Sequence, residues 1–314
     1  MAAVATPERD LRAALGDRLK AGEPLARYTS ARIGGPADWL AAADSAAELA
    51  ELVRGARALG LEPVILGGGS NVLVSDLGVR GLVILNRARL VTFHEATETP
   101  TVWAEAGANL GALARQCCAR GLGGLEWAAT VPGTVGGAVS GNAGAHGGDM
   151  AGNLVLAEIL HQDGSVRRWG PADLELAYRT SRLKRLKALG QPAVVLAAEL
   201  SLTRGDPRAL QATVDEFVAH RKLTQPPGAS LGSMFKNPPG DYAGRLIEAA
   251  GLKGLRIGQA EISPRHANFF VNLGEARAAD VFALIQRAHA TVLAQSGVDL
   301  ELEVELVGEW SGRC

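Results

Sequence analysis

The sequence predicts a globular α+β protein with about two domains. Its 314 residues are enough for two domains of ordinary size, and a composition of 47% apolar and 21% charged residues lies near the globular average. Short β-type runs separated by glycine are mixed with a few helices that carry capping signals, and this mixture favours α+β over an all-helical fold.

The first third of the chain supplies two capped helices and several short strands. Thr6-Pro7 places a capping residue and then proline at the start of a first helix. Ser45 and Glu48 form a capping-box pattern ahead of a second helix, which Gly60 ends. The β-type runs that follow predict strands at 63–66, 71–75, 81–86 and 101–106.

The rest of the chain continues this mixture. Asn109 caps a helix that Gly121 ends, and the glycine-rich passage 121–148 is expected to form loops. Strands are expected at 154–160 and 193–202, with a domain boundary near 203–206 and a helix that Asp206-Pro207 caps. Beyond it we expect a loop at 224–241, a helix at 242–250, strands at 256–262 and 268–273, a helix at 277–295 and a last strand at 299–307.

Charge and cysteine content narrow the class of protein. The 32 basic and 33 acidic residues give a net charge of −1, which offers no general attraction for nucleic acid. Three cysteines, Cys117, Cys118 and Cys314, cannot form a disulfide framework, so we expect a reducing, cytoplasmic compartment. No apolar run approaches 18 residues and the first residues lack a secretory pattern, so we expect no membrane insertion.

The common nucleotide and metal signatures are absent. No GxxxxGK[ST] motif occurs, and GLGGLE at 121–126 lacks the last glycine of the dinucleotide fingerprint and follows a helix instead of a strand. No HExxH or paired CxxC occurs, so we expect no metal site.

Two glycine-rich stretches are the positive signal. Gly67-Gly68-Gly69 with Ser70-Asn71 joins two apolar strands, a pattern typical of a main-chain nest for a phosphate but also of a plain glycine hairpin. The second stretch, 127–138 with 141–146, carries almost no charge and no long charged side chain. It suits either a large flat ligand lying against the backbone or a closely packed loop.

Together with other segments, these stretches resemble the UDP-N-acetylenolpyruvoylglucosamine reductase (MurB) family. The resemblance covers the chain from about residue 25 to the last strand, and the short passage 179–221 resembles the compact (type II) subclass of that family. The similar segments, in the family's order, are 29–37, 65–75, 127–138 with 141–146, 177–181, 232–238, 243–248 with 251–254, and 300–304.

The resemblance implies a fold and a reaction. The fold is a two-lobed FAD-binding module of the vanillyl-alcohol-oxidase/PCMH type followed by an α+β substrate-binding domain. In this chain it implies an N-terminal helical segment at 1–24, FAD-binding lobes at 25–90 and 91–203, and a substrate-binding domain at 204–314. NADPH reduces FAD, NADP leaves, and the enolpyruvyl ether of a UDP-sugar then takes the same site and is reduced to UDP-N-acetylmuramate for peptidoglycan.

The resemblance also assigns site residues. Arg179 matches the catalytic arginine that holds the enolpyruvyl carboxylate, Ser233 the proton donor, and Glu303 the third catalytic residue. Lys236 is a candidate neighbour of Ser233. By themselves these residues would be interpreted as a surface arginine, a turn serine and an acid on a solvated strand face, where Glu301, Glu303 and Glu305 alternate with apolar residues. Glu305 stands where the family often carries arginine.

Two further groups follow from the same resemblance. The expected cofactor-binding residues are Arg32, Ile33, Gly34, Gly67, Gly68, Gly69, Ser70, Asn71, Pro132, Gly133, Thr134, Gly136, Gly137, Asn142 and Gly144. The expected substrate-binding residues are Arg221, Gln225, Lys236, Asn237 and Lys253.

Two rival functions stay open at this point. One is another flavin oxidoreductase with the same FAD lobes, such as an oxidase of hydroxy acids. The other is a UDP-sugar-binding protein that has lost turnover. For the reductase that the resemblance implies, we expect a monomer or weak oligomer.

Overall fold

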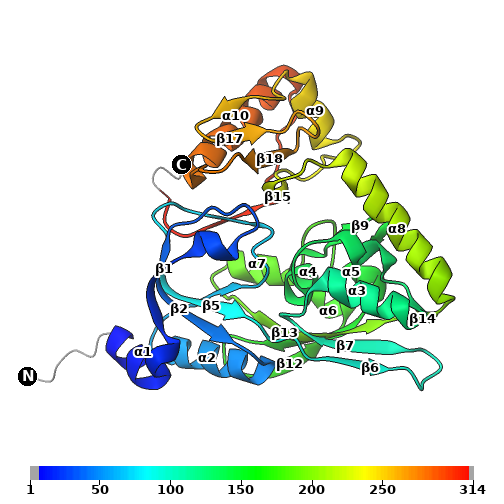
Figure 1. The fold of residues 1–314 in the computed structure, drawn as a ribbon. Helices are drawn as coiled ribbons and strands as arrows, with labels where there is room; N and C mark the ends of the chain where they lie inside the picture. Colours follow the sequence, from blue (N-terminus) through cyan, green and yellow to red (C-terminus); the bar gives the residue numbers. More distant parts are fainter. Residues whose placement is uncertain (1–6, 311–314) are drawn as a thin grey trace, which may run out of the picture. The chain divides into compact units, whose positions relative to one another are not determined.

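The computed structural model describes residues 7–310, and these fall into two compact units (Figure 1). Unit 1 comprises the described part of 1–20 together with 40–68 and 82–220, and unit 2 comprises 21–39, 69–81 and the described part of 221–314. Thr6, the predicted cap of the first helix, and Cys314 lie outside the described residues. The units are described separately below.

Unit 1 is built on a five-stranded antiparallel sheet. Helix α4 (Val135–Gly141) packs on β13 and β7, and α2 (Ala46–Ala58) also packs on β13. Buried side chains of α3 (Leu110–Ala119) join the same core, in which Cys117 and Cys118 are fully buried. The strand order is β12 (Val166–Trp169), β11 (Leu154–Leu160), β13 (Val194–Ser201), β7 (Thr101–Glu105) and β6 (Val91–His94).

Shorter elements complete unit 1. The pair β9 (Gly144–Ala145) and β10 (Gly148–Asp149) forms a tight hairpin, and β8 (Leu122–Gly123) pairs with β14 (Thr203–Arg204). The remaining helices of this unit are α1 (Pro7–Leu15), α5 (Met150–Asn153), α6 (Pro171–Leu174) and α7 (Arg182–Ala188), with 3-10 turns at Gly16–Arg18 and Glu126–Thr130.

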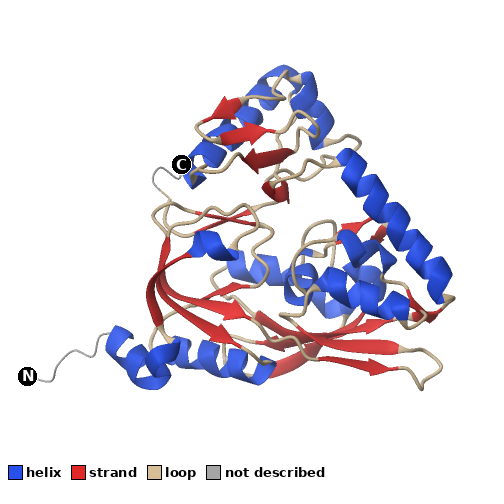
Figure 2. Ribbon diagram, viewed as in Figure 1, coloured by secondary structure: helices blue, strands red, loops and turns tan. Residues whose placement is uncertain are grey.

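Unit 2 contains a four-stranded antiparallel sheet covered by two helices (Figure 2). Helix α10 (Ala278–Ser296) packs on β17 and β16 and against α9 (Ala243–Ala249), which buries a second apolar core. A separate parallel pair joins β4 (Val72–Val74) to β19 (Glu305–Val307). The strand order in the sheet is β15 (Ala229–Ser233), β18 (Phe269–Asn272), β17 (Ala260–Ile262) and β16 (Arg256–Ile257).

Four elements contain residues of both units. The division falls within β1 (Lys20–Pro24), β2 (Pro36–Ala43) and β5 (Val79–Asn86), which form a sheet in the order β1-β2-β5-β3 with β3 (Val64–Leu66). It also falls within helix α8 (Pro207–Thr224). A 3-10 turn at Leu25–Tyr28 lies in unit 2. The chain therefore passes between the units five times.

The predicted caps at Ser45 and Asn109 are confirmed, but the capping box at Ser45 is incomplete. The Ser45 side chain accepts the N–H of Glu48, while the Glu48 carboxylate accepts the N–H of Asp44 instead of the Ser45 N–H that a full capping box requires. The Asn109 side chain accepts the N–H of Ala112 at the start of α3, and Gly121 follows that helix with φ +71°.

Two predicted loops contain regular structure. Residues 135–141 form α4, because burial of Val135, Ala138 and Val139 outweighs the low helix propensity of the glycines. Within the predicted loop 224–241, residues 229–233 form β15 by pairing with β18, and the sequence distance between these strands hides that pairing.

The predicted last strand is also wrong over most of its length. Regular pairing is limited to β19, while Leu302 makes an isolated bridge to Phe235. The N–H groups of Glu303 and Val304 both point to the carbonyl oxygen of Met234, at 2.9 and 3.5 Å, so two residues oppose one, as in a β-bulge. The continuous alternation predicted for the three acids therefore ends at Glu303.

Candidate active site

Arg179 of unit 1 stands on a tight, left-handed turn. The N–H and C=O groups of Ala177 and Thr180 are paired at 3.1 Å, and Arg179 between them has φ +54°. For a residue with a Cβ this conformation costs about 1–2 kcal/mol. Ser181, the residue after this turn, is fully buried, and its hydroxyl group donates a hydrogen bond to the carbonyl oxygen of Ser140 in α4. The turn is thus closed by its own hydrogen bonds and anchored to α4 by the residue that follows it.

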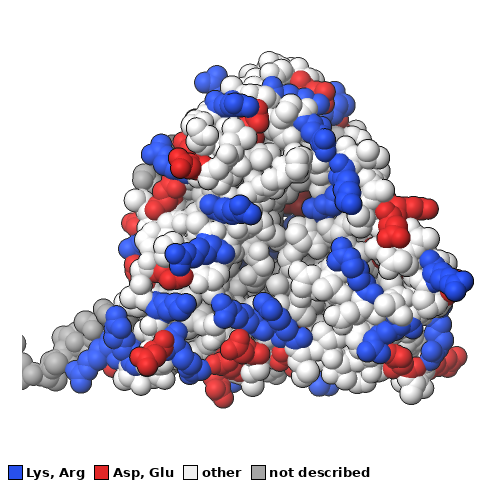
Figure 3. All heavy atoms as spheres, in the orientation of Figure 1, with Lys and Arg blue, Asp and Glu red and all other residues white. Residues whose placement is uncertain are grey.

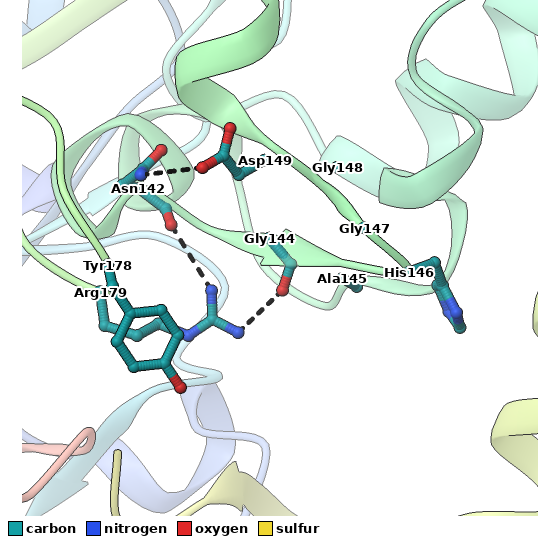
Figure 4. A pocket seen from close by; sticks show the side chains of 9 residues that line it. All are labelled: Asn142, Gly144, Ala145, His146, Gly147, Gly148, Asp149, Tyr178 and Arg179. Carbon is teal, nitrogen blue, oxygen red and sulfur yellow. Dashed lines mark hydrogen bonds between the residues drawn. The ribbon is translucent and has the colours of Figure 1, made fainter. Parts of the chain in front are cut away.

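Main-chain carbonyls orient the Arg179 guanidinium (Figure 4). One terminal nitrogen donates to the carbonyl oxygen of Gly144 at 2.8 Å, and the other lies 3.5 Å from that of Asn142. The guanidinium borders a cavity of about 300 Å³. The cavity is lined by Asn142, Gly144, Ala145, His146, Gly147, Gly148, Asp149, Tyr178 and Arg179.

Asn142 joins the three segments that surround this cavity. Its Nδ2 group donates to the carbonyl oxygen of Ala177 at 3.1 Å and to the Asp149 carboxylate at 3.2 Å, while its Oδ1 accepts the N–H of Ala151 at 2.9 Å. The side chain is buried, and these bonds use both of its amide hydrogens within the protein. Asn142 therefore ties the Arg179 turn to the end of α4 and to the β9–β10 hairpin.

Backbone strain gathers at the same place. Five non-glycine residues of the described chain have positive φ, and three of them, Asn142, His146 and Arg179, line the cavity. Such conformations persist where the surroundings enforce them, and they cluster at active sites. The strain supports a functional role for this cavity.

The glycines of the two predicted FAD stretches meet in unit 1. A Cβ added at Gly67 would lie 2.5 Å from the hydroxyl oxygen of Thr134, and one at Gly68 would lie 2.9 Å from the Cα of Gly133. At Gly137, by contrast, the nearest atom would be Thr134 Oγ1 at 3.7 Å. Gly67 thus packs against the Thr134 side chain and Gly68 against the Gly133 backbone, while exposed Gly137 has room beside it, a cradle that fits an extended dinucleotide such as FAD.

Pro132 and Gly136 also lie in unit 1, and the remaining predicted cofactor residues lie in unit 2. Ile33 is buried, with its N–H and C=O both bonded to the Thr29 hydroxyl, and exposed Arg32 beside it has φ +57°. Gly69 has φ +59°, and a Cβ there would lie 2.0 Å from the carbonyl oxygen of Tyr28. Only glycine therefore fits at position 69 of this loop. Gly34 and Ser70 belong to the same two segments, 29–35 and 69–71.

Ser233 and Glu303 lie on adjoining segments of unit 2. Ser233 ends β15 after a bulge, since Ser230 pairs with Val271 but Ser233 pairs with Phe269, and Gly232 in the bulge has φ +79°. The next residue, Met234, accepts the N–H of Glu303. The predicted proton donor and third catalytic residue are therefore brought together by the backbone.

Asn71 contacts the same region. Its Nδ2 donates to the carbonyl oxygen of Glu303 at 3.0 Å, and its own carbonyl oxygen accepts the N–H of Glu305. Lys236, the predicted neighbour of Ser233, forms an ion pair with Glu301, and its N–H donates to the carbonyl oxygen of the same residue. Thus a predicted cofactor residue and a predicted substrate residue both border the segment that carries Glu303.

The other predicted substrate residues are spread over unit 2. Burial lowers the pKa of the Arg221 guanidinium, and Gln225 follows one turn later. The Asn237 side chain accepts the N–H of Ala243 at the start of α9, and Lys253 pairs with Glu248 at 2.7 Å. The sequence did not single out Asp149 or Tyr178, whose only signal was their place beside a glycine-rich segment and beside Arg179.

No group of three or more His, Cys, Asp or Glu residues that could hold a metal ion occurs between residues 7 and 310. Within the same range, no helix combines the length and apolar character that crossing a membrane requires.

Basic side chains are separated by uncharged surface over much of the face shown in Figure 3.

Comparison with known proteins identifies the family. Residues 37–170 match the family model described as an FAD binding domain, and residues 223–307 match the C-terminal domain of UDP-N-acetylenolpyruvoylglucosamine reductase. The reductase of Chloroflexus aggregans is 47% identical over 289 residues, 92% of this chain and 97% of the relative. That of Rubrobacter xylanophilus is 48% identical over 291 residues, 92% and 95% of the two chains.

A solved structure agrees with these matches. The crystal structure of UDP-N-acetylenolpyruvylglucosamine reductase (MurB) from Thermus caldophilus has a TM-score of 0.78 and 38% identity, over 92% of this chain and 99% of the other. The predicted α+β fold, with an FAD-binding module ahead of a C-terminal domain, is confirmed. The chain belongs to the UDP-N-acetylenolpyruvoylglucosamine reductase family of FAD-containing oxidoreductases.

Proposed function

We propose that this chain catalyses the NADPH-dependent, FAD-mediated reduction of UDP-N-acetyl-3-O-(1-carboxyvinyl)-glucosamine to UDP-N-acetylmuramate in peptidoglycan precursor synthesis. Family membership supports the reaction class, and the match of residues 37–170 supports the cofactor. FAD, when bound, supplies to the substrate a hydride taken from NADPH. Binding of the UDP-sugar is assigned to residues 204–314, which include the matched C-terminal domain.

The observation that carries this proposal is the fixed guanidinium of Arg179. Hydride addition at the methylene carbon of the enolpyruvyl group leaves negative charge on the α-carbon and its carboxylate. A planar guanidinium binds a carboxylate through two parallel hydrogen bonds, and it stabilises charge best when it is oriented before the reaction. The carbonyl oxygens of Asn142 and Gly144 supply that orientation at the edge of the cavity.

Ser233 and Glu303 complete the proposed chemistry. Ser233 gives a proton to the α-carbon, and Glu303 polarises or protonates the intermediate. Their adjoining segments, joined through Met234, support a shared role. NADPH and the UDP-sugar use one site in turn, the enzyme is a monomer or weak oligomer, and the unpaired Cys117 and Cys118 fit a reducing compartment such as the cytoplasm.

Anaerobic stopped-flow absorbance on the holoprotein tests the reaction. NADPH is expected to bleach the flavin, and the enolpyruvyl UDP-sugar is expected to restore its absorbance. In Ser233→Ala, reoxidation by the sugar should slow by about 10²–10⁴-fold, because a general acid is lost, while reduction by NADPH stays intact. A reduced flavin that ignores the sugar but reacts rapidly with oxygen would favour a hydroxy-acid oxidase, and a protein that binds the sugar without turnover would favour a binding protein.

A further inference from the structure

A buried asparagine pairs with the main chain next to Ser233. Asn268, which is 2% exposed, accepts the N–H of Phe235 on its Oδ1 at 3.0 Å and donates from its Nδ2 to the carbonyl oxygen of Phe235 at 2.8 Å. A side-chain amide has the same donor and acceptor pair as a peptide group, so Asn268 takes the place of a neighbouring strand.

The same short segment is held from its other side. Met234 donates its N–H to the carbonyl oxygen of Asn268 at 2.8 Å, and its own carbonyl oxygen accepts the N–H of Glu303 at 2.9 Å. The two-residue segment 234–235 thus lies between Asn268 and the chain that carries Glu303. Ser233 precedes the segment and Lys236 follows it.

The regular pairing of β15 with β18 does not fix the segment 234–235 by itself. β15 is bulged between Ser230 and Ser233, with Gly232 in a left-handed conformation, and its regular pairing with β18 ends at Ser233. A bulge redirects the following side chain but leaves the local ladder incomplete. The hydrogen bond that the Asn268 side chain accepts from Phe235 and the one that it donates to Phe235 fix the backbone just after this interruption.

We propose that Asn268 is a positioning residue for the reduction of the UDP-sugar: by pairing with the backbone of Phe235 it fixes Ser233, and through Met234 it fixes Glu303. This inference rests on the proposed function. Asn268 acts on the protonation of the substrate and not on the reduction of FAD by NADPH, because only protonation uses Ser233.

Asn272 provides a matched control on the same strand. It is also buried, donates to the carbonyl oxygen of Ala31 and accepts the N–H groups of Gly274 and Ala276. Its loss leaves buried partners unsatisfied to a similar extent, but these partners lie outside the Ser233 segment. A purely structural effect should therefore appear in both asparagine variants.

The test measures both half-reactions in holoprotein carrying Asn268→Ala or Asn272→Ala. We expect Asn268→Ala to slow flavin reoxidation by the enolpyruvyl UDP-sugar by up to about 10²-fold, as expected for a misplaced catalytic group, and to change flavin reduction by NADPH less than about threefold. In Asn272→Ala the ratio of the two rates should equal that of the wild type. Combined with Ser233→Ala, Asn268→Ala should slow reoxidation less than it does alone, because one of the two groups that it positions is already lost.

Asn268→Ser keeps a hydroxyl group and covers the case in which Asn268→Ala does not yield folded holoprotein. It should show the same selective loss to a smaller extent. A wild-type ratio of rates in the folded Asn268 variant, or equal slowing of both half-reactions, would overturn the inference while leaving the proposed function intact. If the UDP-sugar cannot reoxidise the reduced flavin of the wild-type protein, the proposed function is overturned instead.

Discussion

The turn that carries Arg179 and the strand end that carries Ser233 differ in which residue takes a left-handed backbone conformation. In unit 1, Arg179 sits on a left-handed turn, and its side chain is oriented by carbonyl oxygens of a neighbouring hairpin. In unit 2, Ser233 and Glu303 are placed by strand pairing and by backbone bonds to Met234, and the positive φ falls on Gly232 instead. In the arginine region a residue with a side chain therefore takes the left-handed conformation, whereas in the serine region a glycine takes it.

The largest expected effect tests the guanidinium itself. Arg179→Lys keeps the charge but removes the planar fork, so we expect the second half-reaction to slow by about 10²–10³-fold with little change in the free energy of unfolding. Rapid-mixing absorbance and urea unfolding measure the two quantities. The control is Arg182→Lys in α7, whose guanidinium lies over the Trp169 ring at 4.8 Å. An equal loss of rate in both variants would contradict a special role for Arg179.

A second prediction separates the contribution of the Asn142 side-chain hydrogen bonds from the cost of its left-handed backbone. Asn142→Ala removes three hydrogen bonds from a buried site, so we expect a loss of about 1–3 kcal/mol in the free energy of unfolding, together with slower reduction of the UDP-sugar. Asn142→Gly loses the same bonds but tolerates φ +42°, so it should be more stable than the alanine variant by about 1 kcal/mol. Equal stability of the two variants would mean that the left-handed backbone carries no strain.

The backbone of the serine region is tested at Gly232. With φ +79° and no atom within 4 Å of an added Cβ, Gly232→Ala introduces strain without a clash. We expect a loss of about 1 kcal/mol in unfolding free energy and slower flavin reoxidation. Gly190→Ala, at φ +73° and also without a nearby atom, should lose similar stability and keep the wild-type rates. If the reduced flavin is reoxidised at the same rate in both variants, the bulge does not position Ser233.

The smallest expected effect concerns pH. Burial, assisted by Lys253, lowers the pKa of His266, so between that pKa and the ordinary value near 6.5 the unfolded chain binds more protons than the folded one. Stability is therefore greatest above about pH 6.5 and falls as pH drops through that value. His266→Gln should lessen the difference in melting temperature between pH 7.5 and pH 5.5. Some dependence should remain, because burial also lowers the pKa of His161 in unit 1.

The sequence predicted what is encoded locally. The caps Ser45 and Asn109 are correct because their partners lie three residues away. Helix α4 and strand β15 were missed because distant burial and pairing decide them. The catalytic trio came from the family resemblance and not from the residues alone, since the atoms that fix Arg179 are main-chain carbonyls, which any residue carries. Asn268 was missed for the same reason: its partner is the backbone of Phe235.

The repeated passage of the chain between the two units has a consequence for biosynthesis. Strand β4 is complete by residue 74, but its parallel partner consists of residues 305–307. The carbonyl oxygen of Ala31 likewise accepts a hydrogen bond from Asn272, which is synthesised much later. Unit 1 has all of its residues by position 220, whereas unit 2 gains the partners of its early segments only much later. During synthesis, therefore, the pairing of β4 and the hydrogen bond to Ala31 form only after unit 1 has all of its residues, so the core of unit 2 is completed last.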